Sequence, residues 1–176
     1  LRFLADPPRD PGLQTRNQLT ITPDSVRTGW VDLLQCQGNL DGLPSVEVTY
    51  RYQTLRGLEV VSMRGIGSAE VEGQTVQLHD VEEGGEGCIH AEVRVFKEIS
   101  PGLFEIKSGP YYRRFLDGYY PVRLDYKILY PYELLRLETL EPAAQEGLTV
   151  AQQPGQVNVM SWFEGKLTLR VGFRVM

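Results

Sequence analysis

The sequence predicts an all-β protein, and three observations support this fold class. Turn-forming and strand-forming residues are abundant, with 18 Gly, 11 Pro and 9 Tyr among 176 residues, and these types favour turns and strands over helices. Several segments alternate apolar and polar residues, as half-buried strands do. Glycine-rich and proline-containing breaks separate these segments at short intervals, as in sandwiches and barrels. We therefore predict a mostly antiparallel β-sandwich, Ig-like or jelly-roll-like, with at most one short helix.

The beginning of the chain predicts an extended arm. The stretch LADPPRDPG is rich in proline, which interrupts both helices and central strands. We predict a Pro-rich arm or linker over residues 1–18, suited to a membrane-proximal tether, and a single β-sandwich domain over residues 19–176. The alternative division is two smaller β-subdomains with a boundary near residues 108–121.

Two segments illustrate how the strands are predicted. The C-terminal stretch KLTLRVGFRVM is the clearest amphipathic strand, because its apolar residues occupy alternate positions. These residues are Leu167, Leu169, Val171, Phe173 and Val175. The segment YELLRLETLEPAAQEG is ambiguous, since its leucines fit either a helix or a strand. Both interpretations stay open for residues 132–147.

Composition and motifs exclude several functional classes. A formal net charge of -5 argues against a general nucleic-acid binder, which usually carries a basic surface. No apolar run approaches the ~20 residues of a transmembrane helix. The stretch GIGSAE contains Gly65 and Gly67 but lacks the third glycine of a dinucleotide loop. No nucleophile elbow, Cys-x-x-Cys pair, His-Glu-x-x-His motif or Walker loop is present. We predict a protein that is not an enzyme, without catalytic residues or a cofactor.

The two cysteines bear on localisation. Cys36 and Cys88 are the chain's only cysteines, and a pair so far apart in an all-β chain fits a disulfide in an oxidising compartment. We take them as a disulfide candidate and predict a periplasmic or secreted protein. Two buried, reduced thiols in a cytoplasmic protein are the alternative.

The two histidines suggest a competing hypothesis. His79 and His90 flank the acidic stretch DVEEGGEGC, and a hairpin centred on Gly84 and Gly85 would place them opposite each other, on the same face as Cys88. Two imidazoles and a thiolate can bind Zn²⁺ or Cu, which implies a small metal-binding protein or metalloenzyme. A shift of one residue in the register would separate the three side chains. Surface histidines beside a solvated acidic turn are the simpler interpretation.

The stretch YYRRFLDGYYP predicts a tight hairpin with the turn at Asp117–Gly118. In this register Leu116 pairs with Tyr119, and Phe115 pairs with Tyr120. One face then belongs to the core and contains Tyr111, Phe115, Tyr120 and Val122, interrupted by Arg113. The other face presents Tyr112, Arg114, Tyr119 and Arg123, which we predict to be the binding residues.

These residues define the predicted function. Tyr and Arg are enriched where proteins bind one another, so we predict a non-catalytic binding or assembly module. It would be an extracytoplasmic subunit that contacts a protein partner or a larger envelope complex, through the Tyr/Arg face or by pairing the C-terminal strand with a partner's edge. Two alternatives are a carbohydrate-binding module that uses Tyr112 and Tyr119, and arginines that merely stack on tyrosines within the hairpin.

Overall fold

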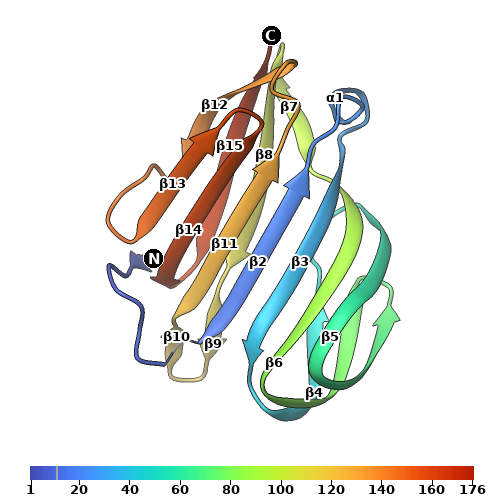
Figure 1. The fold of residues 1–176 in the computed structure, drawn as a ribbon, viewed down its shortest axis with the longest axis vertical. Coiled ribbons are helices and arrows are strands. Elements are labelled where there is room, and N and C mark those ends of the chain that lie inside the picture. Colours follow the sequence, from blue (N-terminus) through green and yellow to red (C-terminus); the bar gives the residue numbers. More distant parts are fainter. Residues whose placement is uncertain (11) are drawn as a thin grey trace.

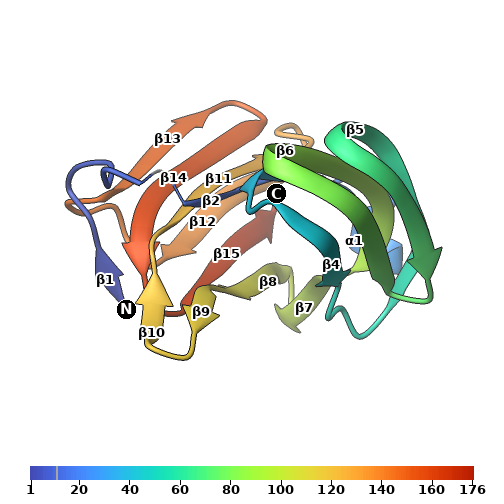
Figure 2. The same cartoon turned by 90° about the horizontal axis from the view of Figure 1, so that it is seen from below.

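A computed structural model, which describes residues 1–10 and 12–176, contains two sheets packed face to face (Figure 2). The described part is strand throughout, apart from loops and the four-residue helix α1, Ser25–Thr28. The predicted fold class is therefore confirmed. The sheets are mostly antiparallel, but β2 and β11 pair in parallel. None of the described helical residues form a segment long and apolar enough to cross a membrane.

The larger sheet has nine strands and faces the viewer in Figure 1. Its central path runs β1–β14–β11–β2–β3–β6–β4, with β13 also paired to β14 and β5 also paired to β6. The bounds are β1 Arg2–Phe3, β2 Leu13–Thr20, β3 Trp30–Leu40, β4 Leu43–Thr49, β5 Leu55–Glu72, β6 Thr75–Arg94, β11 Val122–Leu129, β13 Leu148–Gln153 and β14 Gln156–Glu164.

The second layer is a four-stranded sheet in the order β12–β15–β8–β7. Its strands are β7 Phe96–Ser100, β8 Leu103–Tyr111, β12 Leu135–Glu141 and β15 Leu167–Val175. A separate two-stranded sheet, β9 Arg113–Phe115 with β10 Gly118–Tyr120, lies where the chain passes from β8 to β11. Residues 108–121, the alternative domain boundary, thus form the passage from one sheet to the other.

The hydrophobic core fills the space between the two layers. Alternate residues of the strands point inward and form one buried cluster, as period-two patterning requires. Its largest fully buried members include Tyr126, Phe163, Phe173, Leu19, Leu33 and Ile106.

Strands β5 and β6 form one long hairpin that bends sharply (Figure 2). The predicted turn at Gly84–Gly85 is wrong, because β6 continues through both glycines. Glycine instead permits a bend there: a side chain on Gly85 would meet the carbonyl oxygen of Gly65 at 2.9 Å. The backbones of β5 and β6 approach each other closely at this point, because neither Gly65 nor Gly85 has a Cβ atom.

The N-terminal arm is shorter than predicted. Strand β2 begins at Leu13 and pairs with both β3 and β11, so residues 13–18 belong to the sheet. Arg2 and Phe3 also pair with β14. Thr15 and Asn17 are buried, and the tertiary contacts of this strand outweigh the proline-rich sequence before it. The predicted arm includes Pro11, which lies outside the described residues.

Two further strand assignments are settled by the pairing. The ambiguous segment 132–147 contains strand β12, paired with β15, so its leucines pack as in a sheet. The C-terminal strand β15 has the predicted buried face, but β12 and β8 occupy its two edges. It therefore cannot add to a partner's sheet, and that part of the functional prediction is wrong.

Candidate binding surface on the β9–β10 hairpin

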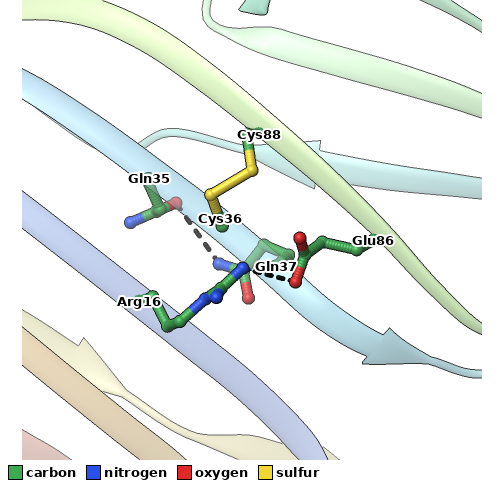
Figure 3. Close-up of a disulfide and its surroundings, with 6 residues drawn as sticks. All are labelled: Arg16, Gln35, Cys36, Gln37, Glu86 and Cys88. Carbon is green, nitrogen blue, oxygen red and sulfur yellow. Dashed lines mark hydrogen bonds and ion pairs between the residues drawn. A yellow bond between two sulfur atoms is a disulfide. The ribbon is translucent and has the colours of Figure 1, made fainter. Parts of the chain in front are cut away.

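The two cysteines form a disulfide between neighbouring strands (Figure 3). Cys36 on β3 lies directly opposite Cys88 on β6, with a Cα–Cα distance of 4.1 Å. The bond lies on the outer face of the large sheet, opposite to the inward side chain of Gln35. The predicted disulfide is thus present, and such bonds persist in oxidising compartments.

The three residues of the metal hypothesis are not brought together. His79 pairs with Ser45 and Ser68, whereas His90 pairs with Leu34 and Glu59 on the other side of the bend in β6. The sulfur of Cys88 is bonded to Cys36 and offers no thiolate. Within residues 1–10 and 12–176, no group of three His, Cys, Asp or Glu side chains is arranged to hold a metal ion.

The predicted hairpin is present, with a shift in its register. Phe115 pairs with Gly118 and Arg114 pairs with Tyr119, so the turn residues are Leu116 and Asp117. The turn lies one residue earlier than predicted, so each residue pairs with a partner two positions before the predicted one. Because side chains alternate with a period of two, this shift leaves each side chain on its predicted face. The Tyr120 hydroxyl donates a hydrogen bond to Asp117 at 2.5 Å, and this bond raises the pKa of Tyr120.

Three of the four predicted binding residues form one exposed patch. The rings of Tyr112 and Tyr119 meet edge to face, with centroids 6.3 Å apart. The Arg114 guanidinium lies 5.6 Å from the Tyr119 ring centre, and the Lys166 ammonium lies 5.3 Å from that of Tyr112. We call Tyr112, Arg114, Tyr119 and Lys166 the hairpin patch. Lys166 has no sequence signal that links it to the hairpin, because it lies between β14 and β15.

Arg123 does not belong to the hairpin patch. It lies on the outer face of β11, where it pairs with Asp125 at 2.8 Å and approaches the Trp162 ring to 5.8 Å. The prediction continued the hairpin ladder to residue 123. The ladder ends at Tyr120, and Val122 begins the pairing of β11 with β14 and β2.

The predicted core face is confirmed for Val122, which is buried, and for Tyr111, which packs against the core, but it is wrong for Phe115 and Tyr120 in the hairpin itself. Phe115 is 48% exposed and meets Tyr120 edge to face, with ring centres 5.1 Å apart. Arg113 lies over both rings and donates two hydrogen bonds, at 2.9 and 2.7 Å, to Asp41 in the loop after β3. The Arg113 side chain is only 16% exposed. This partly buried, charge-assisted pair anchors the hairpin to the sandwich.

Sequence patterning missed a group of polar side chains buried between the two sheets. Asn17 donates a hydrogen bond to the Tyr111 hydroxyl at 2.5 Å, and that hydroxyl lies 2.8 Å from Ser108 Oγ. Tyr126 neighbours Asn17 across the β2–β11 pair. We call Asn17, Ser108, Tyr111 and Tyr126 the buried tyrosine cluster. The inward positions of Asn17 and Ser108 in alternating strands were the available signal.

Burial governs the acid–base behaviour of the tyrosines around this cluster. It raises the pKa of Tyr52 to about 12 and also raises the pKa of Tyr50, Tyr111 and Tyr126. Neighbouring tyrosines add to the increase for Tyr50 and Tyr111. The cause is the cost of placing a phenolate between the sheets.

The comparison with known proteins yields a likeness of fold. No protein-family model and no curated protein sequence matches the chain. Solved structures do match: one is an M1 zinc metallopeptidase from Deinococcus radiodurans bound to a Tyr-Ser-Ala substrate, at 14% identity and a TM-score of 0.50. Another is a two-domain M1 zinc metallopeptidase bound to L-tryptophan, at 14% identity and a TM-score of 0.49.

The match covers most of this chain but less than half of the metallopeptidase chain. It includes 93% of this chain and 43% of the first metallopeptidase chain, so this chain spans less than half the length of that structure. At this identity the likeness concerns the β-fold alone.

Proposed function

We propose that this chain is a non-catalytic binding domain that contacts a partner protein through the hairpin patch. The observation that supports this best is the exposure of Tyr112, Arg114 and Tyr119 on a hairpin that Arg113 holds to the sandwich through Asp41. Preorganised side chains lose little conformational entropy on binding. Tyr and Arg are also the residues that most often dominate binding energy at protein interfaces.

The charge of the patch indicates the kind of partner. Arg114 and Lys166 make no ion pair with a described carboxylate, although the whole chain has a net charge of -5. A local basic surface complements an acidic region of a partner, because interfaces pair electrostatic potentials of opposite sign. We therefore propose that the hairpin patch binds an acidic surface of a partner protein.

The fold likeness supports a place in a larger assembly. The matched metallopeptidase continues well beyond the region that this chain covers, and we propose that this chain likewise serves as a non-catalytic β-domain. The engagement of Cys88 in a disulfide supports this proposal over the metal alternative.

We further propose a periplasmic or secreted location. The Cys36–Cys88 bond supports it, because oxidising compartments preserve disulfides. The membrane-proximal tether remains a prediction for the residues before β2.

Co-purification tests the proposed surface. A tagged chain is recovered from native envelope extract, and the bound proteins are compared between wild type and a Tyr119→Ala/Arg114→Ala double variant. We expect the double variant to lose its partner, because it removes both the ring and the stacked guanidinium. Tyr132→Ala is the matched control, since Tyr132 is exposed but lies outside the hairpin patch.

Three outcomes contradict the proposal. The partner stays bound to the double variant, the Tyr132 control loses it equally, or the wild-type chain is always isolated as a free monomer. Retention on a glycan resin that Tyr112→Ala abolishes would assign the same surface to carbohydrate binding instead.

A further inference from the structure

A shallow depression lies on the outer face of the large sheet, away from the hairpin patch. It is lined by Gln18, Thr20, Asp32, Leu34, Glu59, Val61 and His90. These residues come from four adjacent strands, β2, β3, β6 and β5. The depression lies toward the end of β2 at Thr20, whereas the hairpin lies near the beginning of β2 at Leu13 (Figure 1).

Irregular pairing in β5 forms one wall of the depression. The register between β5 and β6 shifts between Arg56 and Glu59 and again between Val60 and Ser62. Val61 is therefore the extra residue of the second β-bulge. The first β-bulge, between Arg56 and Glu59, contains Gly57, which adopts a positive φ of 65°. Bulges redirect side chains and increase local twist. Together they place Glu59 and Val61 beside His90.

The carboxylates of the depression lack a strong cationic partner. Asp32 Oδ1 lies 3.4 Å from His90 Nε2, and Glu59 Oε1 lies 3.7 Å from His90 Nδ1. Both distances exceed those of ordinary charge-assisted hydrogen bonds. No described Arg or Lys pairs with either carboxylate. On the same face of the sheet, Glu86, Glu92 and Asp125 each pair with an arginine.

The apolar part of the lining is also exposed. Leu34 and Val61 are 40% and 49% accessible to solvent, and Gln18 and Thr20 supply neutral polar groups on the opposite wall. A ligand that fits this lining combines an apolar stem with a cationic end. Lysine and arginine side chains have this form, with alkyl stems that pack on apolar surface.

We propose that the depression binds a basic side chain, lysine or arginine, from an extended segment of a partner protein. The alkyl stem packs on Leu34 and Val61, and the cation approaches the exposed carboxylates of Asp32 and Glu59 beside the His90 ring. Among nearby cations, Arg56 is already held by Glu92, and Lys127 lies beyond Gln18 on β11. The site is additional to the hairpin patch and does not depend on it.

Titration with capped peptides tests this assignment. The probe is a pentapeptide with a central lysine flanked by leucines, and its control carries glutamate in place of the lysine. Isothermal titration calorimetry at low salt measures affinity, and the backbone NMR signals of Thr20, Leu34 and Val61 locate the site. We expect the lysine peptide to bind at least about tenfold more tightly, because like charges oppose the glutamate peptide.

The two histidines provide a matched pair of variants. His90→Lys introduces a permanent cation between Asp32 and Glu59 and is expected to weaken binding about tenfold. His79→Lys makes the same change on the same strand, 4.0 Å from Glu70, but outside the depression. It is expected to leave affinity within about twofold. An Asp32→Asn/Glu59→Gln variant repeats the test without adding a charge, and circular dichroism verifies folding of each variant.

Several results would overturn the proposal. They are equal affinity for the lysine and glutamate peptides, equal losses in His90→Lys and His79→Lys, or peptide binding that survives Asp32→Asn/Glu59→Gln. Binding of n-butylamine as tight as that of the lysine peptide would overturn the assignment to a protein partner.

Discussion

Tyr111 and Tyr112 are adjacent in the sequence, but they lie in opposite environments. The Tyr111 hydroxyl is enclosed between the sheets and contacts Asn17 and Ser108. Tyr112 lies at the surface, where its ring meets Tyr119 and the ammonium of Lys166. The same contrast separates the buried tyrosine cluster from the hairpin patch as a whole. The side chain is identical, so the environment determines whether a tyrosine stabilises the fold or is available to a partner.

The contrast also shows why aromatic density is a weak indicator of function. The buried cluster contributes packing and hydrogen bonds between layers, whereas the patch contributes an accessible ring and charge. Stability measurements should therefore respond to changes in the cluster, and binding measurements to changes in the patch. Three predictions examine this separation, beginning with the largest expected effect.

Alkaline pH should unfold the domain through its buried tyrosines. In the unfolded chain tyrosine has a pKa near 10, whereas burial raises the pKa of Tyr52 to about 12 and those of Tyr50, Tyr111 and Tyr126 upward too. Above pH 10 the unfolded state releases protons that the folded state keeps, so the free energy of unfolding falls. Each such tyrosine contributes up to about 1.4 kcal/mol per pH unit. We expect full stability below pH 10 and cooperative unfolding between about pH 10 and 12.

Far-UV circular dichroism and tyrosinate absorbance, recorded over the same pH range, measure this transition. The buried tyrosines should ionise together with the loss of the β-sheet signal. A sheet signal that persists while every tyrosine ionises would contradict the burial of the cluster.

The sequence predicts much of the fold, since alternation identifies strands such as β15 and the Asp117 turn region identifies the β9–β10 hairpin. It does not predict the path of β6, because paired glycines permit both a turn and a bend. Only the approach of Gly65 to Gly85 decides between them. The start of β2 was missed for a similar reason: pairing with two neighbouring strands outweighs the effect of nearby prolines.

The candidate site was predictable only in part. The faces of Tyr112, Arg114 and Tyr119 follow from period-two geometry, which survived the shift in register. The contribution of Lys166 and the departure of Arg123 depend on how distant strands meet. Local patterns contain no information on such contacts.

Truncation of one tyrosine from each group should separate burial from aromatic contact. Tyr126 and Tyr119 each meet another tyrosine edge to face, at 6.5 and 6.3 Å, but Tyr126 is only 2% exposed. Tyr126→Ala should lower the free energy of unfolding by about 3 to 5 kcal/mol through lost burial and a cavity. Tyr119→Ala should change it by less than about 0.5 kcal/mol. Urea denaturation monitored by fluorescence measures both.

Comparable losses in Tyr126→Ala and Tyr119→Ala would mean that the hairpin is part of the folding core. The separation between the cluster and the patch would then be incorrect. Unchanged m-values would show that the two variants are compared against similar unfolded states.

The smallest expected effects come from removing single hydroxyls within the buried tyrosine cluster. Tyr111→Phe leaves Asn17 and Ser108 without their hydrogen-bond partner, which should cost about 1 to 3 kcal/mol. Tyr126→Phe removes a buried hydroxyl that makes no hydrogen bond to any described protein group. It should therefore be neutral within about 0.5 kcal/mol or slightly stabilising. Thermal and urea unfolding of the two variants give the comparison.

The two phenylalanine variants preserve ring volume, so their difference isolates hydrogen bonding from packing. If Tyr126→Phe costs as much as Tyr111→Phe, the Tyr126 hydroxyl is also satisfied in solution, and the hydrogen-bonded part of the cluster extends to β11. If neither variant loses stability, the contacts among Asn17, Ser108 and Tyr111 contribute little beyond packing. In that case the buried tyrosines stabilise the sandwich mainly through their rings, and the contrast with the hairpin patch rests on burial alone.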